Sequence, residues 1–293
     1  MSGSRAGLVR TGLDRIAAGD GSALASLRGR SVGLLAHPAS VDRRLRHALP
    51  ILLEAGVRVR ALFGPEHGFG GEAQDMVGVD SKPRGAIPTY SLYGTSAAAL
   101  MPRPEWLEGL DAVVVDLQDV GSRYYTYVWT AALMLRAAAA RGIQLIVLDR
   151  PNPLGGDRIE GRPQRPGYRS FVGLYDLPVR HGLTLAEIVE FVRREEGIDE
   201  AALEIVEVRG WQRRMSFQET GLPWVLPSPN MPTVETAQVY PGGCVIEGTS
   251  LSEGRGCTRP FEIFGAPWLD GEALARSVTI EGALLRPLRF QPT

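Results

Sequence analysis

The chain has 293 residues, of which 44% are hydrophobic and 22% are charged, and its formal net charge is −1. This composition is that of a globular protein with one large α/β domain or two smaller ones. The near-neutral charge excludes the basic surface of a protein that binds nucleic acid or an anionic membrane. No uninterrupted apolar stretch is long enough to span a bilayer.

The first twenty residues contain scattered Arg and Asp and no apolar run, so they do not form a secretion signal as written. A cytoplasmic location is therefore expected, with export possible if the N-terminus is incomplete. Two cysteines, Cys244 and Cys257, are too few for a disulfide framework. We expect both to be small core residues.

Apolar runs bounded by turn residues predict the strands of a sheet. These runs lack polar alternation, which favours parallel strands buried on both faces. The predicted strands are residues 31–36, 57–63, 112–117, 143–149 and 203–208. The predicted helices are residues 43–55, 127–141 and 184–196, and Thr184 with Glu187 forms a capping-box pattern at the start of the last one. This alternation predicts an α/β fold, a parallel sheet with helices on both faces.

The pattern changes beyond Trp211. Residues 221–259 are dense in Pro, Gly and polar residues, with one strand predicted at 244–247. This segment is either a wall of an active site built from loops or the approach to a second domain. A helix is predicted at 270–278 and a strand near 285–290, after which the chain stops without a closing element.

Three predicted strands end in loops of unusual composition. In an open parallel sheet, ligands bind beyond the carboxyl ends of the strands. Turns need Gly, Pro or Asn, but they do not need the charged and aromatic residues found here. The candidate residues in these loops are Glu66 and His67 after the second strand, Asp119, Arg123 and Tyr124 after the third, and Arg150 and Asn152 after the fourth.

Glu66 is the first candidate for catalysis. Pro65 stiffens the backbone before it, Gly68 permits a tight return, and Phe63 and Phe69 are apolar neighbours. Partial desolvation would raise the pKa of a carboxyl here, as a general acid requires. The alternative is a solvated turn glutamate. His67 could orient Glu66, bind substrate or simply complete the turn.

The remaining candidates have open alternatives. Asp119 and Arg123 could form a structural ion pair, or Arg123 could bind a substrate carboxylate through two parallel hydrogen bonds. Glu247, Glu253 and Arg255 lie in glycine-rich surroundings that would allow close approach to a ligand, or form a charged hairpin tip. Asn230, in a stiff proline-rich stretch, could reach a sugar hydroxyl or belong to a rigid linker.

Several chemistries are disfavoured. The sequence has no dinucleotide-binding glycine motif after the first strand, no Walker loop and no Gly-x-Ser-x-Gly elbow. The four histidines lack the close spacing of a zinc site. Carboxylates, arginine and tyrosines remain, and this set suits cleavage of a glycosidic bond.

A series of motifs resembles the exo-β-N-acetylmuramidases, a bacterial family formerly catalogued as a domain of unknown function. The resemblance runs from about Ser31 to the end of the chain. The motifs, in order, are LFGPEHGF at 62–69, YSLYG at 90–94, DLQDVGSRYYTY at 116–127, VLDRPNPLGG at 147–156, FVGLY at 171–175, GLPWVLPSPNMP at 221–232, YPGGCVIEGT at 240–249 and SEGRGCTRPF at 252–261.

This resemblance implies a Rossmann-like catalytic domain, taken as residues 1–257, and the beginning of a smaller C-terminal domain at 258–293. It implies an active site in the cleft between them. It also implies exo-hydrolysis of N-acetylmuramic acid from the non-reducing end of peptidoglycan fragments, in cell-wall turnover or recycling, without a cofactor or metal. Family members continue past residue 293, so the second domain is expected to be incomplete.

Carried over motif by motif, the resemblance implies that Glu66 is the catalytic acid. Asp119, Arg123 and Tyr124 fall in the second site motif, and Glu247, Glu253 and Arg255 in the later ones. Asp119 or Glu247 could act as base or nucleophile, or the substrate's own acetamido group could attack. Arg123 or Arg255 could bind the lactyl carboxylate of muramic acid. The alternative function is a muramyl-sugar-binding protein without catalysis.

Overall fold

The computed structural model describes residues 8–71, 86–94 and 96–292. The chain forms two compact units, Met1–Pro229 and Asn230–Thr293. The first unit contains a β-sheet with helices, and the second consists of helices and turns.

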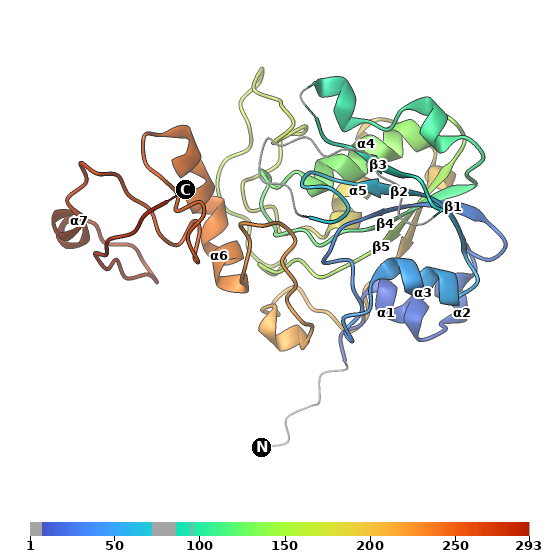
Figure 1. Ribbon diagram of the computed structural model, residues 1–293, viewed down its shortest axis with the longest axis horizontal. Coiled ribbons are helices and arrows are strands. Elements are labelled where there is room, and N and C mark those ends of the chain that lie inside the picture. The colour runs from blue at the N-terminus through green and yellow to red at the C-terminus, as the bar shows by residue number, and fades with distance from the viewer. Residues whose placement is uncertain (1–7, 72–85, 95, 293) are drawn as a thin grey trace. The chain divides into compact units, whose positions relative to one another are not determined.

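A six-stranded sheet forms the centre of the first unit (Figure 1). Its order is β3-β2-β1-β4-β5-β6, the strand order of Rossmann folds. Every neighbouring pair is parallel, so all carboxyl ends lie at one edge. The predicted Rossmann-like α/β fold class is therefore confirmed. The strands are β1 (Ser31–Ala36), β2 (Arg58–Gly64), β3 (Thr89–Ser91), β4 (Ala112–Asp116), β5 (Gln144–Leu148) and β6 (Leu203–Val206).

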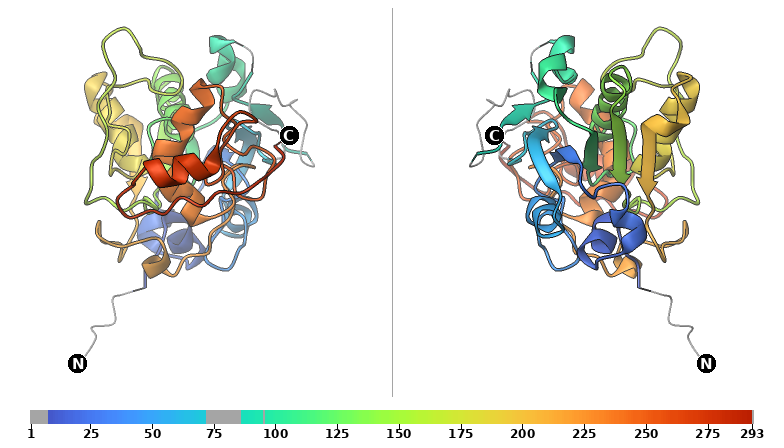
Figure 2. Two further views of the ribbon diagram at one scale, coloured as in Figure 1. Left: turned by 90° about the vertical axis from the view of Figure 1, so that its left-hand side faces the viewer. Right: turned by 90° about the vertical axis from the view of Figure 1, so that its right-hand side faces the viewer.

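Helices cover both faces of the sheet (Figures 1 and 2). One face carries α1 (Gly12–Ala17), α2 (Gly21–Leu24) and α3 (Ala48–Glu54), and the other carries α4 (Tyr127–Ala139) and α5 (Leu185–Glu195). Short 3₁₀ turns complete the unit at η1 (Ala97–Leu100), η2 (Pro104–Leu107), η3 (Glu200–Ala202) and η4 (Gln218–Thr220). The predicted capping box at Thr184 and Glu187 is present with both of its hydrogen bonds.

Two differences from the predicted helices have local causes. The first turn of the predicted helix 43–55 is absent, because Asp42 Oδ1 accepts hydrogen bonds from the backbone N–H groups of Arg44 and Arg46 and holds a turn there. Helix α3 therefore starts only after His47. Helix α1 was not predicted, although Thr11 and Asp14 form a capping box that marks its start.

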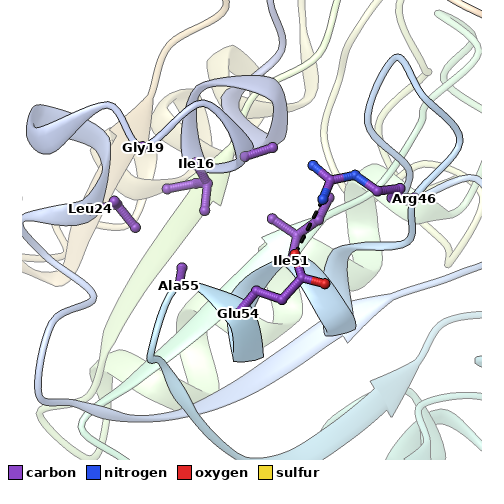
Figure 3. Close-up of a pocket in the computed structure, with 8 residues that line it drawn as sticks. Ile16, Gly19, Leu24, Arg46, Ile51, Glu54 and Ala55 are labelled. Atoms are coloured by element: carbon purple, nitrogen blue, oxygen red, sulfur yellow. Dashed lines mark hydrogen bonds and ion pairs between the residues drawn. The ribbon is translucent and has the colours of Figure 1, made fainter.

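A shallow hollow of about 210 Å³ lies between α1, α2 and α3 (Figure 3). Its walls are largely apolar, with the Arg46–Glu54 ion pair of 3.2 Å on one side. Only one of its lining residues, Arg46, belongs to a loop at the carboxyl edge of the sheet, and none is a predicted site residue. We therefore do not regard it as the functional site.

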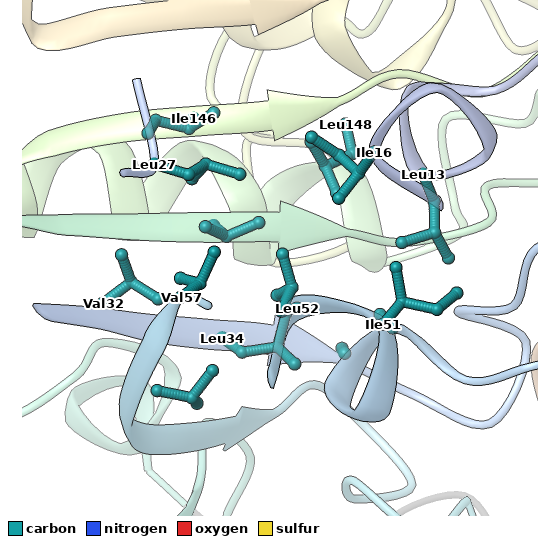
Figure 4. Packing of buried hydrophobic residues seen from close by; sticks show 14 of the residues in the cluster. Leu13, Ile16, Leu27, Val32, Leu34, Ile51, Leu52, Val57, Ile146 and Leu148 are labelled. Atoms are coloured by element: carbon teal, nitrogen blue, oxygen red, sulfur yellow. The ribbon is translucent and has the colours of Figure 1, made fainter. Parts of the chain in front are cut away.

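The core beneath α1 and α3 is formed by aliphatic side chains from helix and sheet (Figure 4). Alternate residues of β1, Val32 and Leu34, point to this face together with Ile146 and Leu148 of β5. Leu52 of α3 packs against them and has no exposed surface. Burial of this apolar area is the main favourable contribution to folding of the unit.

The second unit contains α6 (Val234–Gly243), η5 (Cys244–Gly248) and α7 (Gly271–Ser277). The strand predicted at 244–247 is wrong, because η5 continues directly from α6 and leaves Val245 58% exposed. The strand predicted near 285–290 is also wrong, since these residues have no regular structure. The helix predicted at 270–278 is confirmed by α7, whose N-cap is Asp270.

The division between the units follows Pro229, whereas the sequence suggested a domain boundary after residue 257. Contacts within the second unit explain why residues 230–257 group with the end of the chain. The rings of Tyr240 and Phe261 meet edge to face with centroids 4.8 Å apart. Thr236 Oγ1 donates a hydrogen bond of 2.7 Å to Glu262 Oε1, and Ser252 pairs with Gly265 through the backbone.

Neither cysteine forms a disulfide, and both are half-buried, so the expectation of core cysteines is wrong. Cys244 instead lies in η5, where its Sγ is 3.3 Å from Glu247 Oε2. In the part of the chain that the structure describes, no helix has both the length and the hydropathy of a membrane span.

Two adjacent leucines of α3 provide a test of the core. Replacing the buried Leu52 in a Leu52→Ala variant should lower the free energy of unfolding by about 2–5 kcal/mol, because it removes buried methyl groups and leaves a cavity. Leu53 is 48% exposed, and Leu53→Ala should cost less than about 1 kcal/mol. Chemical denaturation of both variants measures this difference, and equal losses would contradict the packing described.

Candidate active site

The loops that follow β1 and β4 leave the sheet where its strand order changes direction. Such a switch point is where ligands bind in open α/β sheets. His37, which follows β1, has no exposed surface, and its Nε2 accepts a 2.9 Å hydrogen bond from the backbone N–H of Gln118 after β4. Burial is the main reason that the pKa of His37 lies well below its usual value, and the positive charge of Arg150 lowers it further. His37 is therefore a neutral connector between the two loops.

Glu66 lies in the turn that follows β2. Gly64 is required there, since a Cβ would come within 2.2 Å of the Phe69 nitrogen. His67 and Gly68 both adopt positive φ, at 70° and 82°, which reverses the chain tightly. The Glu66 side chain is only 8% exposed. The predicted desolvation of this carboxyl is thus present in the structure.

Residues at the start of α4 contact both the side chain and the backbone of Glu66. Thr126 Oγ1 donates a hydrogen bond of 2.6 Å to Glu66 Oε2. Tyr127 Oη donates one of 2.5 Å to the carbonyl of Pro227 and lies 3.4 Å from the carbonyl of Glu66. The ring of Tyr127 also lies 5.0 Å from that of His37. The turn after β2 is therefore joined to α4 and to the loop after β1.

Asp119 is buried in the loop after β4. Burial raises its pKa to about 7, although its bonds with the backbone N–H groups of Gly121 and Val120 oppose this. The side chain that faces Asp119 is His181, whose Nε2 lies 3.7 Å from Asp119 Oδ2. Burial lowers the pKa of His181 to about 4. Among the described residues, Asp119 Oδ1 and His181 Nε2 have no hydrogen-bond partner. Asp119 is thus a carboxyl poised to change protonation near neutral pH.

Arg123 does not pair with Asp119, so the alternative of a structural ion pair is wrong. Its Nη1 instead donates to the carbonyls of Arg162, at 3.0 Å, and Leu177. Its guanidinium carbon lies 5.2 Å from the ring centroid of Tyr124. Arg123 therefore fixes segment 157–180 to the loop that carries Asp119.

Arg150 and Asn152 are engaged in structural contacts. Arg150 forms two hydrogen bonds with Asp116, of 2.5 and 2.8 Å, and a third of 2.8 Å with the carbonyl of Val41. Asn152 donates to the carbonyl of Leu183 and accepts from the backbone N–H of Leu154. These contacts bring the loops after β1, β4 and β5 together.

The later candidates belong to the second unit. Arg255 lies between two carboxylates, with Nη2 2.5 Å from Glu247 Oε1 and Nε 2.8 Å from Glu253 Oε1. Asn230 is half-buried at the start of this unit. The structure thus brings Glu247, Glu253 and Arg255 into one cluster.

Four residues at the carboxyl edge were not predicted as site residues. Thr126 and Tyr127 fall within the motif at 116–127, but a threonine before a helix ordinarily signals a cap. His37 and His181 were judged only by their spacing in the sequence, which does not reveal contacts across the sheet. Within the described residues, no group of three or more His, Cys, Asp or Glu side chains could hold a metal ion.

The fold and site define a Rossmann-like α/β protein with buried acidic side chains, Glu66 and Asp119 among them, in the loops at the carboxyl edge of its sheet. A model of the N-terminal part of exo-beta-N-acetylmuramidase NamZ matches residues 32–235, and one of the C-terminal part matches residues 238–293. The chain therefore belongs to the exo-beta-N-acetylmuramidase NamZ family.

Individual relatives agree with this assignment. The chain is 46% identical over 273 residues to the peptidoglycan beta-N-acetylmuramidase NamZ of Bacillus subtilis (strain 168), which covers 91% of this chain and 65% of that protein. It thus spans slightly less than two thirds of that relative. Two crystal structures of DUF1343 family proteins from Bacteroides fragilis NCTC 9343 are also similar.

The first crystal structure has a TM-score of 0.81 and 36% identity, covering 92% of this chain and 68% of its own. The second has a TM-score of 0.72 and 30% identity, covering 90% of this chain and 68% of its own.

The buried ion pair between Asp116 and Arg150 should contribute strongly to stability. Arg150→Met leaves Asp116, which has no exposed surface, buried without its partner and should lower the free energy of unfolding by about 3–5 kcal/mol. Replacing both residues, in Arg150→Met with Asp116→Leu, should recover part of this loss. Arg141→Met, at an exposed arginine, is the control, and chemical denaturation is the measurement. A loss for Arg150→Met no larger than that of the control would contradict a structural role.

The raised pKa of Asp119 predicts a pH dependence of stability. The folded protein keeps the proton up to about pH 7, whereas the unfolded chain loses it near pH 4. The stability contributed by protonated Asp119 is therefore full below pH 4 and lost as the pH rises to 7. His181 has a lowered pKa, so its own contribution to stability rises with pH over part of the same pH range. This contribution is present in both wild type and an Asp119 variant, which is why the two proteins are compared at each pH.

In Asp119→Asn, the free energy of unfolding relative to wild type should therefore rise between pH 4 and pH 7 and then level off. Denaturation at a series of pH values measures this, with the exposed Asp157→Asn as control. A difference that stays constant across this range would show that Asp119 is ionised throughout.

Proposed function

We propose that the protein is a glycoside hydrolase that releases N-acetylmuramic acid from the non-reducing end of peptidoglycan fragments, with Glu66 as general acid. Membership of the NamZ family supports the reaction, since the Bacillus subtilis relative is named as a peptidoglycan beta-N-acetylmuramidase. The observation that carries the assignment of the acid is the burial of the Glu66 carboxyl in a fixed turn at the carboxyl edge of the sheet.

In this reaction Glu66 gives its proton to the glycosidic oxygen as the bond between that oxygen and the anomeric carbon breaks. The bonding electrons go to the departing oxygen, and positive charge develops on the muramyl ring. Water then supplies the hydroxyl group at the anomeric carbon and returns a proton to the enzyme. A buried carboxyl suits the first step, because burial disfavours its charged form.

Asp119 is the proposed second group within the first unit. It is buried at the same edge of the sheet, and its pKa of about 7 leaves a substantial ionised fraction at neutral pH. An ionised Asp119 could act as base or nucleophile, or orient an acetamido group of the substrate for attack. Glu247 remains the candidate from the second unit, where Arg255 holds its carboxylate.

The lactyl carboxylate of muramic acid needs a cationic partner. Arg123 is proposed for this role because its Nε has no hydrogen-bond partner among the described residues. The Nε–H group can therefore bind a carboxylate while Nη1 binds backbone carbonyls. Arg255 is the alternative, and its two carboxylate neighbours would compete with the substrate. We propose that His67 and Tyr124 line the sugar-binding region of the first unit, that Arg150 and Asn152 support its loops, and that Asn230 is a sugar-binding candidate of the second unit.

A sugar-binding protein without catalysis would share the arginine and the aromatic rings. It would gain nothing from a carboxyl that is desolvated and fixed by a hydroxyl group, and burial of that carboxyl costs free energy. The geometry of Glu66 therefore supports the hydrolase over the binding protein.

Two leaving groups distinguish a general acid from other roles of Glu66. A sugar leaving group needs a proton, so Glu66→Gln should lower kcat for a muramyl disaccharide by roughly 10²- to 10⁴-fold. The 4-nitrophenyl muramide should lose much less, because 4-nitrophenolate leaves without protonation. Release of muramic acid and of 4-nitrophenol measures the two rates.

Glu108→Gln, at an exposed glutamate, is the matched control, and the 4-nitrophenyl N-acetylglucosaminide tests selectivity for muramic acid. Equal losses on both muramides would exclude Glu66 as the proton donor. Saturable binding without turnover by the wild-type protein would instead favour the binding protein.

A further inference from the structure

Thr126 occupies the N-cap of α4 but does not cap the helix. N-cap threonines ordinarily adopt an extended backbone and accept a hydrogen bond from the second or third helical N–H. Thr126 has φ −72° and ψ −12°, a helical conformation, and its side chain makes no capping bond. Thr11, Thr184 and Thr233 all adopt the extended conformation and cap α1, α5 and α6.

The hydroxyl of Thr126 is instead directed to Glu66. It donates to Glu66 Oε2 at 2.6 Å, and both side chains are buried. The backbone of Thr126 is held by the helix, since its carbonyl accepts from the N–H groups of Trp129, at 3.0 Å, and Thr130, at 2.9 Å. Thr130 Oγ1 also donates to this carbonyl, at 3.2 Å. The hydroxyl is thus fixed in position by α4.

Helix α4 can retain its start without the missing cap because tertiary packing stabilises it. Ten of its thirteen residues are buried, including Trp129, whose Nε1 donates a 2.8 Å hydrogen bond to the carbonyl of Arg123. Tyr127, the first residue of the helix, holds the backbone of Pro227 and approaches that of Glu66. The start of α4 therefore provides a rigid frame for Glu66.

We propose that Thr126 is a positioning residue for Glu66, whose hydroxyl fixes the carboxyl plane of the acid through the catalytic cycle. This inference rests on the proposed function of Glu66. An ionised carboxylate can only accept hydrogen bonds, so Thr126 must donate when Glu66 has lost its proton. When Glu66 carries its proton on Oε1, Oε2 still accepts from Thr126. The same hydrogen bond can persist in both states.

The bond also stabilises the ionised form of Glu66, in opposition to burial. Titratable groups near it include Tyr127 of α4 and His67 in the same turn, and the ring of His37, after β1, lies 5.0 Å from that of Tyr127. Burial raises the pKa of Tyr127 and lowers that of His37, which leaves both neutral near pH 7. Removing the Thr126 hydroxyl should therefore raise the pKa of Glu66.

Thr126→Val and Thr126→Ser test this role. The valine is close in shape and lacks the hydroxyl, whereas the serine retains it. With a muramyl disaccharide, Thr126→Val should lower kcat about tenfold through misorientation of the acid, with KM within about twofold of wild type. The basic limb of the kcat profile should move upward by about one pH unit, which is the difference that one charge-assisted hydrogen bond supplies. Thr126→Ser should restore both values to near wild type.

Thr11→Val is the matched control, because it removes a hydroxyl that caps α1. It should lower Tm without moving the pH profile. A Thr126→Val protein that is folded and keeps the wild-type profile, or a Thr126→Ser protein that behaves like the valine variant, would overturn the proposal.

Carbon-13 NMR of glutamate-labelled protein separates this inference from the proposed function. The Glu66 carboxyl signal is assigned by its loss in Glu66→Gln and then titrated in wild type and Thr126→Val. A wild-type protein without turnover would overturn the proposed function. Even then, an upward shift of the Glu66 pKa in Thr126→Val would establish that the Thr126 hydroxyl controls the pKa of Glu66. An unchanged pKa would overturn the positioning role whether or not the protein is active.

Discussion

The parallel direction of all six strands is the constraint on which the site depends. Because each strand ends at the same edge, loops far apart in the sequence meet there. The edge is then consolidated by buried polar contacts. The Asp116–Arg150 pair links β4 to the loop after β5 and reaches the carbonyl of Val41, and His37 links the loops after β1 and β4. Each contact satisfies polar groups that would be costly to bury alone.

This edge places carboxyl groups in contrasting environments. Asp116 is neutralised by an arginine through two hydrogen bonds, which suits a structural role. Asp119 instead faces a histidine that burial keeps neutral, and its own pKa is raised. Glu66 is held by the hydroxyl of Thr126. Perturbed carboxyl groups at a switch point are typical of functional sites, whereas a fully paired carboxylate is typical of a scaffold.

The sequence was sufficient to predict five of the six strands of the first unit, because runs such as 113–115 and 145–148 are apolar without alternation and are bounded by turn residues, as buried strands are. It also located the Glu66 turn, since proline and glycine on either side restrict the backbone there. Strand β3 was missed because three residues carry no periodicity. In the second unit, the apolar pair Val245 and Ile246 was interpreted as a strand, but it continues α6 as a 3₁₀ turn.

The partners of the site residues were beyond prediction, because they depend on contacts across the sheet. Nothing in the spacing of Asp119 and Arg123 shows that the first faces His181 and the second binds carbonyls of residues 162 and 177. Thr126 resembles an ordinary cap in the sequence. Only the packing of α4 against the Glu66 turn reveals the other use of its hydroxyl.

The most direct test of the proposed hydrolase is to incubate the purified protein with two isomeric disaccharides and identify the products by mass spectrometry. One substrate has N-acetylmuramic acid β-linked at the non-reducing end, and the other has N-acetylglucosamine there. Release of equimolar N-acetylmuramic acid and N-acetylglucosamine from the first substrate alone is the predicted result. A folded protein that leaves both disaccharides intact, or cleaves them equally, would contradict the assignment.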